Sequence, residues 1–66
     1  MQKGIIKSYD RVGGSGVIGR SSDIDIKFNG TRVLGSRNDL KQGDSVWFEV
    51  EIMQSNQSAI NIRKCM

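Results

Sequence analysis

The first clear strand pattern in this chain is Asp23-Ile24-Asp25-Ile26-Lys27-Phe28, in which polar and apolar side chains alternate. Successive side chains of a strand point to opposite faces of a sheet, so the alternation predicts a strand with one buried and one solvated face. The same pattern recurs in Val46-Trp47-Phe48-Glu49-Val50-Glu51 and in Ile60-Asn61-Ile62-Arg63. Because no segment keeps helical apolar spacing for more than one turn, the chain is predicted to be all-β.

Two less regular segments complete a set of five short strands. Residues 4–9 and 16–19 are rich in β-branched side chains, and turn-forming residues gather at 10–14, 20–22, 29–44 and 54–58. Lys41-Gln42-Gly43-Asp44 predicts a tight turn before the strand that contains Val46. A chain of 66 residues is too short for a sandwich. We therefore expect a single domain, residues 1–66, that closes five strands into a small barrel without free edges.

Composition excludes several classes of protein. The chain has no histidine and one cysteine, Cys65 near the C-terminus, so it offers little for nucleophilic catalysis, a zinc cluster or a disulfide. We expect a non-enzyme without cofactor or metal, with Cys65 as a free thiol. Apolar runs are only two or three residues long, which predicts a cytoplasmic protein without membrane contact. The net charge of +3 favours polyanions mildly.

Two motifs invite a chemical interpretation that their context does not support. Gly14-Ser15-Gly16-Val17-Ile18-Gly19 satisfies the dinucleotide fingerprint G-x-G-x-x-G, but no helix pattern follows it, so close approach of strands explains these glycines better. Asp23 and Asp25 face the same side of a strand and could bind a cation. The favoured interpretation is a solvated face on which Lys27 is the charge partner.

The order of these features resembles the cold-shock domain family over nearly the whole chain. The segments that carry the resemblance are Gly4–Asp10 for G-x-V-K-W-F-N, Gly13–Ile18 for K-G-F-G-F-I, Asp23–Phe28 for D-V-F-V-H-F, Leu40–Val50 for L-x-x-G-x-x-V-x-F-x-V and Ala59–Ile62 for A-A-N-V. The resemblance implies an all-β fold, a small five-stranded antiparallel Greek-key barrel of the OB-fold type. It also implies binding of single-stranded RNA or DNA on outward-facing aromatic rings within a basic surface.

The aromatic positions of the family are mostly replaced in this chain. Four family rings correspond to Ser8, Ser15, Val17 and Asp25, whereas Tyr9 and Phe28 keep a ring and Lys27 stands for histidine. Each lost stack removes about 1–3 kcal/mol of binding. The predicted function is therefore weak, mainly electrostatic binding of single-stranded RNA or DNA with little sequence preference. The predicted binding residues are Lys7, Tyr9, Lys27, Phe28, Arg32 and Arg37.

A protein-interaction module that has lost nucleic-acid binding is the alternative. If Val46 and Phe48 face the core, Trp47 points outward, where it would anchor a homodimer or a second protein. The replaced face with Ser8 and Asp25 would serve the same purpose. The competing interpretation of Trp47 is a ring that folds over a neighbouring strand or caps the barrel.

Overall fold

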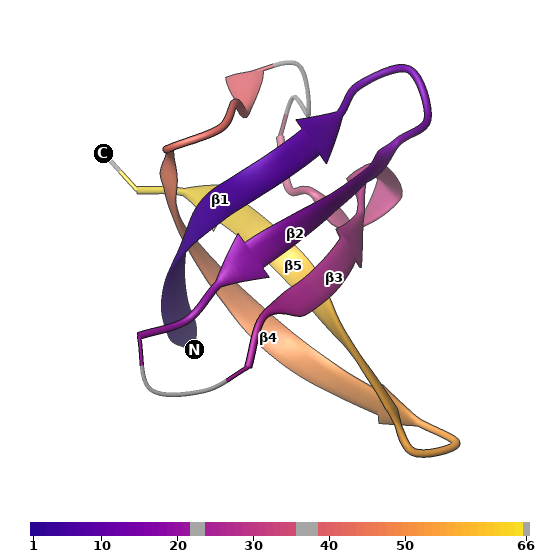
Figure 1. Ribbon diagram of the computed structural model, residues 1–66. Coiled ribbons are helices and arrows are strands. Elements are labelled where there is room, and N and C mark those ends of the chain that lie inside the picture. Colours follow the sequence, from indigo (N-terminus) through magenta and orange to yellow (C-terminus); the bar gives the residue numbers. More distant parts are fainter. Residues whose placement is uncertain (22–23, 36–38, 66) are drawn as a thin grey trace.

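The computed structural model describes residues 1–21, 24–35 and 39–65, and within them the chain is almost entirely β. The elements are β1 (Gln2–Asp10), β2 (Ser15–Gly19), β3 (Ile26–Asn29), the 3-10 helix η1 (Gly30–Arg32), β4 (Ser45–Met53) and β5 (Asn56–Lys64). Figure 1 shows β1, β2 and β3 side by side, with β4 and β5 crossing behind them. No helix in the described ranges has the length and apolar character needed to span a membrane.

The five strands close into a barrel in the order β1-β2-β3-β5-β4, which confirms the predicted barrel of the OB-fold type. Four of the strand pairings are antiparallel, but β3 and β5 run parallel through Lys27 opposite Ser58 and Phe28 opposite Ala59. One parallel pairing thus completes an otherwise antiparallel barrel. The parallel pair arises because the chain crosses between β3 and β4 before the β4–β5 hairpin returns it alongside β3.

The core fills the barrel with side chains from every strand. Its buried members are Ile6, Ile18, Ile26, Phe28, Leu40, Val46, Phe48, Ala59 and Ile62. Val46 and Phe48 are fully buried, as their alternation with Trp47 predicts. Because these residues come from all five strands and from the segment before β4, the core forms only when the barrel closes.

Two apolar residues do not follow the predicted alternation. Ile24 lies before β3 and is 75% exposed, so the period-2 pattern begins only at Ile26. In β5 the buried residues are Ala59 and Ile62, three positions apart, and Ile60 is only half-buried. The cause is a bulge at Asn61, whose φ of 51° shifts the register between β4 and β5 and inverts the side-chain phase.

The turns largely match their sequence signals. The amide of Gly14 donates to the carbonyl of Asp10 at 2.7 Å and closes the β1–β2 turn, where Gly14 has a φ of 77°. The amide of Asp44 donates to the carbonyl of Lys41 at 3.1 Å in the predicted tight turn. The predicted turn at 54–58 is shorter than expected, because β5 already begins at Asn56. The free thiol of Cys65 is half-buried.

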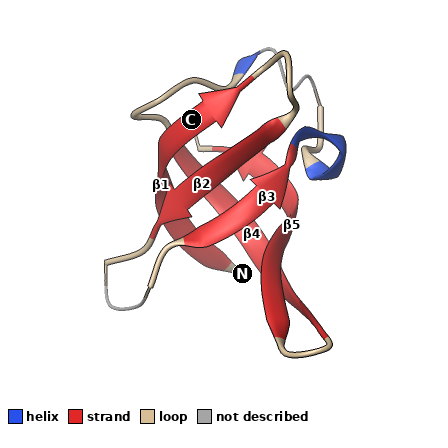
Figure 2. Ribbon diagram, turned by 45° about the vertical axis from the view of Figure 1, so that its right-hand side comes forward, coloured by secondary structure: helices blue, strands red, loops and turns tan. Residues whose placement is uncertain are grey.

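The β4–β5 hairpin is longer than the barrel wall that it forms. β4 pairs with β1 only through Ser45–Phe48, and beyond Phe48 it pairs with β5 alone. Figure 2 shows the end of this hairpin projecting past the other strands. Its tip exposes Ile52 (66%) and Met53 (62%).

Candidate nucleic-acid interface

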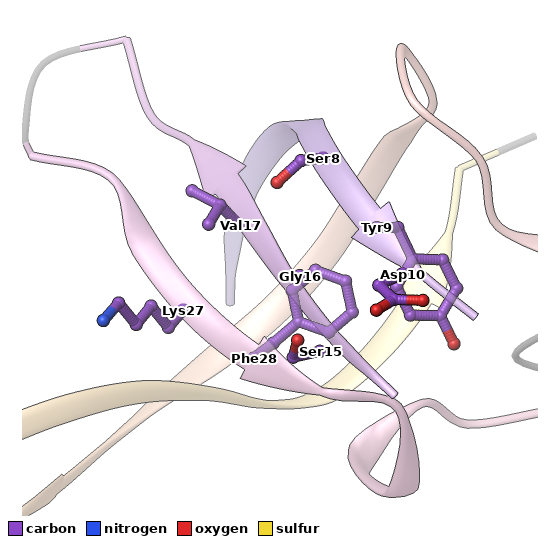
Figure 3. A pocket seen from close by; sticks show the side chains of 8 residues that line it. All are labelled: Ser8, Tyr9, Asp10, Ser15, Gly16, Val17, Lys27 and Phe28. Carbon is purple, nitrogen blue, oxygen red and sulfur yellow. The ribbon is translucent and has the colours of Figure 1, made fainter. Parts of the chain in front are cut away.

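An open hollow of about 510 Å³ covers the ends of β1 and β2 and the middle of β3. Its lining residues, drawn in Figure 3, are Ser8, Tyr9, Asp10, Ser15, Gly16, Val17, Lys27 and Phe28. They correspond closely to the positions at which the cold-shock resemblance predicts binding. Strand register explains why they meet, since Ser8, Val17 and Lys27 form one cross-strand row and Tyr9, Gly16 and Phe28 form the next.

Two rings form the apolar side of the hollow, and neither is freely exposed. Tyr9 is half-buried against the core, and Phe28 is buried with 4% of its surface exposed. The burial of Phe28 agrees with its place among the apolar residues of the alternating segment, and it leaves little of the ring open to a stacked base. β3 alternates from buried Ile26 through exposed Lys27 to buried Phe28, and this phase turns the Phe28 ring inward.

The remaining wall of the hollow lacks aromatic rings. Ser8 and Ser15 are exposed, and Val17 is half-buried between Ser8 and Lys27. These side chains offer hydroxyl groups and a small apolar surface in place of flat rings. Stacking contributes little here, and the chemistry left to the hollow is hydrogen bonding and charge.

Lys7 and Asp25 neutralise each other at the surface. The ammonium of Lys7 donates to Oδ2 of Asp25 at 3.0 Å, with 59% and 43% of the two side chains exposed. The sequence favoured Lys27 as the partner of Asp25, and this prediction is wrong. Lys7 reaches Asp25 because the bulge between Ile6 and Ser8 places it outside the regular β1–β2 register. Because the two charges offset each other, Lys7 attracts a phosphate less strongly and Asp25 repels it less strongly than either side chain would alone.

Lys27 is the basic residue that lies directly in the hollow. It is exposed, and its side chain makes neither a hydrogen bond nor an ion pair with any residue in the described parts of the chain. In Figure 3 its side chain extends away from the two rings. Asp10, on the opposite side, uses Oδ1 to accept a hydrogen bond from the amide of Val12 at 3.0 Å. The charge in the hollow is therefore divided, positive at β3 and negative at the β1–β2 turn.

A second hollow of about 180 Å³ adjoins the first, because Lys27 and Phe28 line both. Arg32 and Glu51 line its far side, 3.9 Å apart between Nη2 and Oε1. Asn29 positions this arginine: its side-chain oxygen accepts from the amide of Thr31 at 3.0 Å and caps η1. Arg32 thus joins Lys27 along one surface. Arg37, also predicted to bind, lies outside the described residues.

Trp47 points outward from β4, as the alternation predicts, and is 39% exposed. The ammonium of Lys3 lies over its ring, 5.6 Å from the centroid. This segment is not a free strand edge, in agreement with the predicted closed barrel. Trp47 pairs with Lys3 of β1 on one side and with Arg63 of β5 on the other. A role of Trp47 in protein binding stays a prediction.

The sequence did not predict the basic neighbours of Trp47 or the acidic neighbour of Arg32. Lys3 and Arg63 meet Trp47 through strand register, and Glu51 of β4 meets Arg32 of η1 at the second hollow. Local alternation predicted that Glu51 and Arg63 face outward. It gave no means of pairing them across strands.

The two chemical motifs of the sequence find structural explanations. A Cβ on Gly16 would lie 2.5 Å from the Phe28 ring and 2.7 Å from the carbonyl oxygen of Ser8, so the glycine motif serves strand packing. Within residues 1–21, 24–35 and 39–65, no group of three or more acidic or cysteine side chains could hold a metal ion. Asp23 lies outside these ranges.

Comparison with known proteins adds no family assignment. No protein-family model matches this chain, and no curated protein matches it either.

Proposed function

We propose that this chain is a divergent, non-enzymatic cold-shock-like barrel that binds single-stranded RNA or DNA weakly along its two adjoining hollows. The observation that carries the proposal is the position of Lys27, a cation without a partner in the described structure, where the two hollows meet. Arg32 provides a second cation at the far side, because its exposed 3.9 Å contact with Glu51 is long and weak enough to give way to a phosphate. Both side chains line the second hollow, so one extended strand can contact both.

The proposed mechanism is phosphate pairing with little stacking. Lys27 and Arg32 bind phosphate oxygens, and the hydroxyls of Ser8 and Ser15 donate hydrogen bonds to the backbone or to base edges. Tyr9 offers part of one ring. These two phosphate contacts on a single strand contribute about −1.4 to the slope of the logarithm of affinity against that of salt concentration.

Sequence preference should be small for the same reason. Phosphate contacts position a strand but do not read its bases, and this surface lacks the rings that would hold individual bases. Binding of oligopyrimidines and oligopurines should therefore differ much less than binding at low and at moderate salt.

NMR titration of the isotope-labelled protein with a short oligothymidylate tests this proposal. At low salt we expect amide shifts at residues 8–10, 15–17 and 27–32, which shrink as salt is added. Electrostatic affinity is greatest at low salt. If the amide resonances of these residues do not shift at low salt, the proposal that nucleic acid binds to this surface is wrong.

Matched charge variants locate the contact. Lys27→Gln should weaken binding and reduce the salt slope by about 0.7. Lys41→Gln removes the same charge from the exposed turn before β4, outside both hollows, and should change neither quantity. Equal effects of the two variants would indicate a response to net charge alone and would contradict a defined site.

Protein binding is the second candidate, and the projecting hairpin is the observation that favours it. Ile52 and Met53 together expose an apolar tip beyond the barrel wall. Such a tip is suited to insertion into an apolar groove of another protein. Replacement of both residues by threonine should abolish capture of a protein partner in a pull-down and leave the oligothymidylate titration unchanged. Capture of the same partner by the double variant would reject this candidate.

A further inference from the structure

We propose that the row Lys3–Trp47–Arg63 is a second nucleic-acid contact, with Trp47 as the stacking platform and the two cations as phosphate contacts. The inference rests on the proposed function for its ligand but uses a different surface of the barrel. In the closed strand order this row crosses β1, β4 and β5, whereas the first hollow covers β1, β2 and β3.

Ring exposure is the first argument. Phe28 is 4% exposed and Tyr9 is half-buried, but Trp47 is 39% exposed. The chain has four aromatic residues, and the remaining one, Phe48, is fully buried. A base that stacks on this protein therefore finds its largest accessible ring at Trp47.

The placement of charge is the second argument. Lys3 and Arg63 are direct cross-strand neighbours of Trp47 on opposite sides, and both are exposed. Neighbouring strands are about 4.8 Å apart, so the two cations bracket the ring at a short distance on either side. A base on an aromatic ring, with backbone phosphates on flanking cations, is the general arrangement of single-strand recognition.

The contact between Lys3 and Trp47 is compatible with this use. The ammonium lies 5.6 Å from the ring centroid in the free protein. An exposed cation–π contact is weaker than a base–aromatic stack, and the flexible lysine stem allows the ammonium to swing toward a phosphate as the base arrives. Lys3 thus covers the ring until a ligand replaces it.

The same charges disfavour a homodimer through Trp47. A two-fold contact places the same row on both subunits, so Lys3 and Arg63 of one copy would face cations of the other. Like charges at such a contact oppose association. The nearest acidic side chain on the outward face of β4 is Glu49, and its Oε2 already accepts a hydrogen bond from Nδ2 of Asn61 at 2.6 Å.

Tryptophan fluorescence tests the inference directly, since Trp47 is the only tryptophan. The probe is an oligothymidylate of about eight nucleotides, within the site sizes of OB folds. We expect quenching of Trp47 at low salt. Trp47→Ser should weaken binding of the same oligonucleotide, carrying a dye, by roughly five- to 150-fold, the equivalent of one lost stack.

Two double variants separate this inference from the proposed function. Lys3→Gln with Arg63→Gln should abolish the quenching and reduce the salt slope by about 1.4, while amide shifts in the hollow persist. Lys27→Gln with Arg32→Gln should abolish the amide shifts in the hollow, while quenching of Trp47 persists. Shifts in the hollow without quenching of Trp47 would overturn the inference and leave the proposed function standing. Quenching of Trp47 without amide shifts in the hollow would support the contact at Trp47 and overturn the proposed binding along the two hollows.

Two further outcomes would overturn the inference in favour of a protein partner. One is equal quenching by polyglutamate, which would show that any acidic chain suffices. The other is a dimeric mass in sedimentation that Trp47→Ser reduces to that of a monomer.

Discussion

The rings of Tyr9 and Phe28 meet across Gly16, with centroids 5.4 Å apart and planes tilted by 35°. Gly16 lies between them in the strand register and has no side chain to separate them. Because the two rings pack on each other and on the core, they contribute more to barrel stability than to base stacking.

Gly16→Ala should lower the free energy of unfolding by about 1–3 kcal/mol, the usual cost of overpacking. The new methyl group would meet the Phe28 ring at 2.5 Å and the Ser8 carbonyl at 2.7 Å. Gly19→Ala is the control on the same strand, because its methyl group meets only the flexible side chain of Lys7, at 2.8 Å. Its effect should stay within about 0.5 kcal/mol. Urea denaturation measures both, and equal losses would contradict this account.

Tyr9→Phe should raise the free energy of unfolding by about 1 kcal/mol. The Tyr9 hydroxyl is buried and has no hydrogen-bond partner in the described structure, so it carries a desolvation cost without compensation. Phenylalanine keeps the contact with Phe28 and removes that cost. Thermal denaturation gives the comparison. A destabilised Tyr9→Phe variant would show that the hydroxyl has a partner in solution.

Asp25→Asn should strengthen oligonucleotide binding by releasing Lys7. The salt slope should steepen by about 0.7, the contribution of one added phosphate contact on a single strand. Stability should change by less than about 1 kcal/mol, because both partners are substantially exposed. Dye-labelled oligonucleotide titrations at several salt concentrations measure the slope. The double variant Asp25→Asn with Lys7→Gln should have the salt slope of the wild type. A salt slope that stays steep in the double variant would show that Lys7 does not cause the change.

Asn61→Val should lower the free energy of unfolding by about 1–2 kcal/mol more than Asn61→Gly. Residue 61 has a φ of 51°, a conformation that glycine adopts freely and a β-branched residue does not. Both variants lose the hydrogen bond to Glu49, so their difference isolates the backbone term. Matched urea curves provide the measurement, and equal stabilities would mean that the bulge moves to another residue.

Local alternation was sufficient to predict the barrel, because each strand has one buried face. Val46, Phe48 and Ile26 are buried as expected. The prediction failed where a bulge changed the phase, as at Ile60, or where the strand began later than the pattern, as at Ile24. A bulge depends on the backbone of a single residue, and alternation carries no information about it.

The candidate site was predictable by position but not by exposure or pairing. The family resemblance placed Tyr9, Lys27 and Phe28 together, and the structure brings them into one hollow. It did not reveal that Phe28 turns inward or that Lys7 pairs with Asp25. The inward turn of Phe28 follows from the local alternation within β3, whereas the contact of Lys7 with Asp25 depends on how segments distant in sequence lie against each other.

The parallel pairing of β3 with β5 also has a consequence for the order of folding. Its register holds two residue pairs, fewer than any other pairing in the barrel. The β1–β2–β3 meander and the β4–β5 hairpin can each form from neighbouring segments, but this pairing requires closure of a long loop. We expect β3–β5 to form last and to open first, so the amides that bond between Lys27–Phe28 and Ser58–Ala59 should exchange with solvent hydrogen sooner than those at the centre of the β4–β5 pairing.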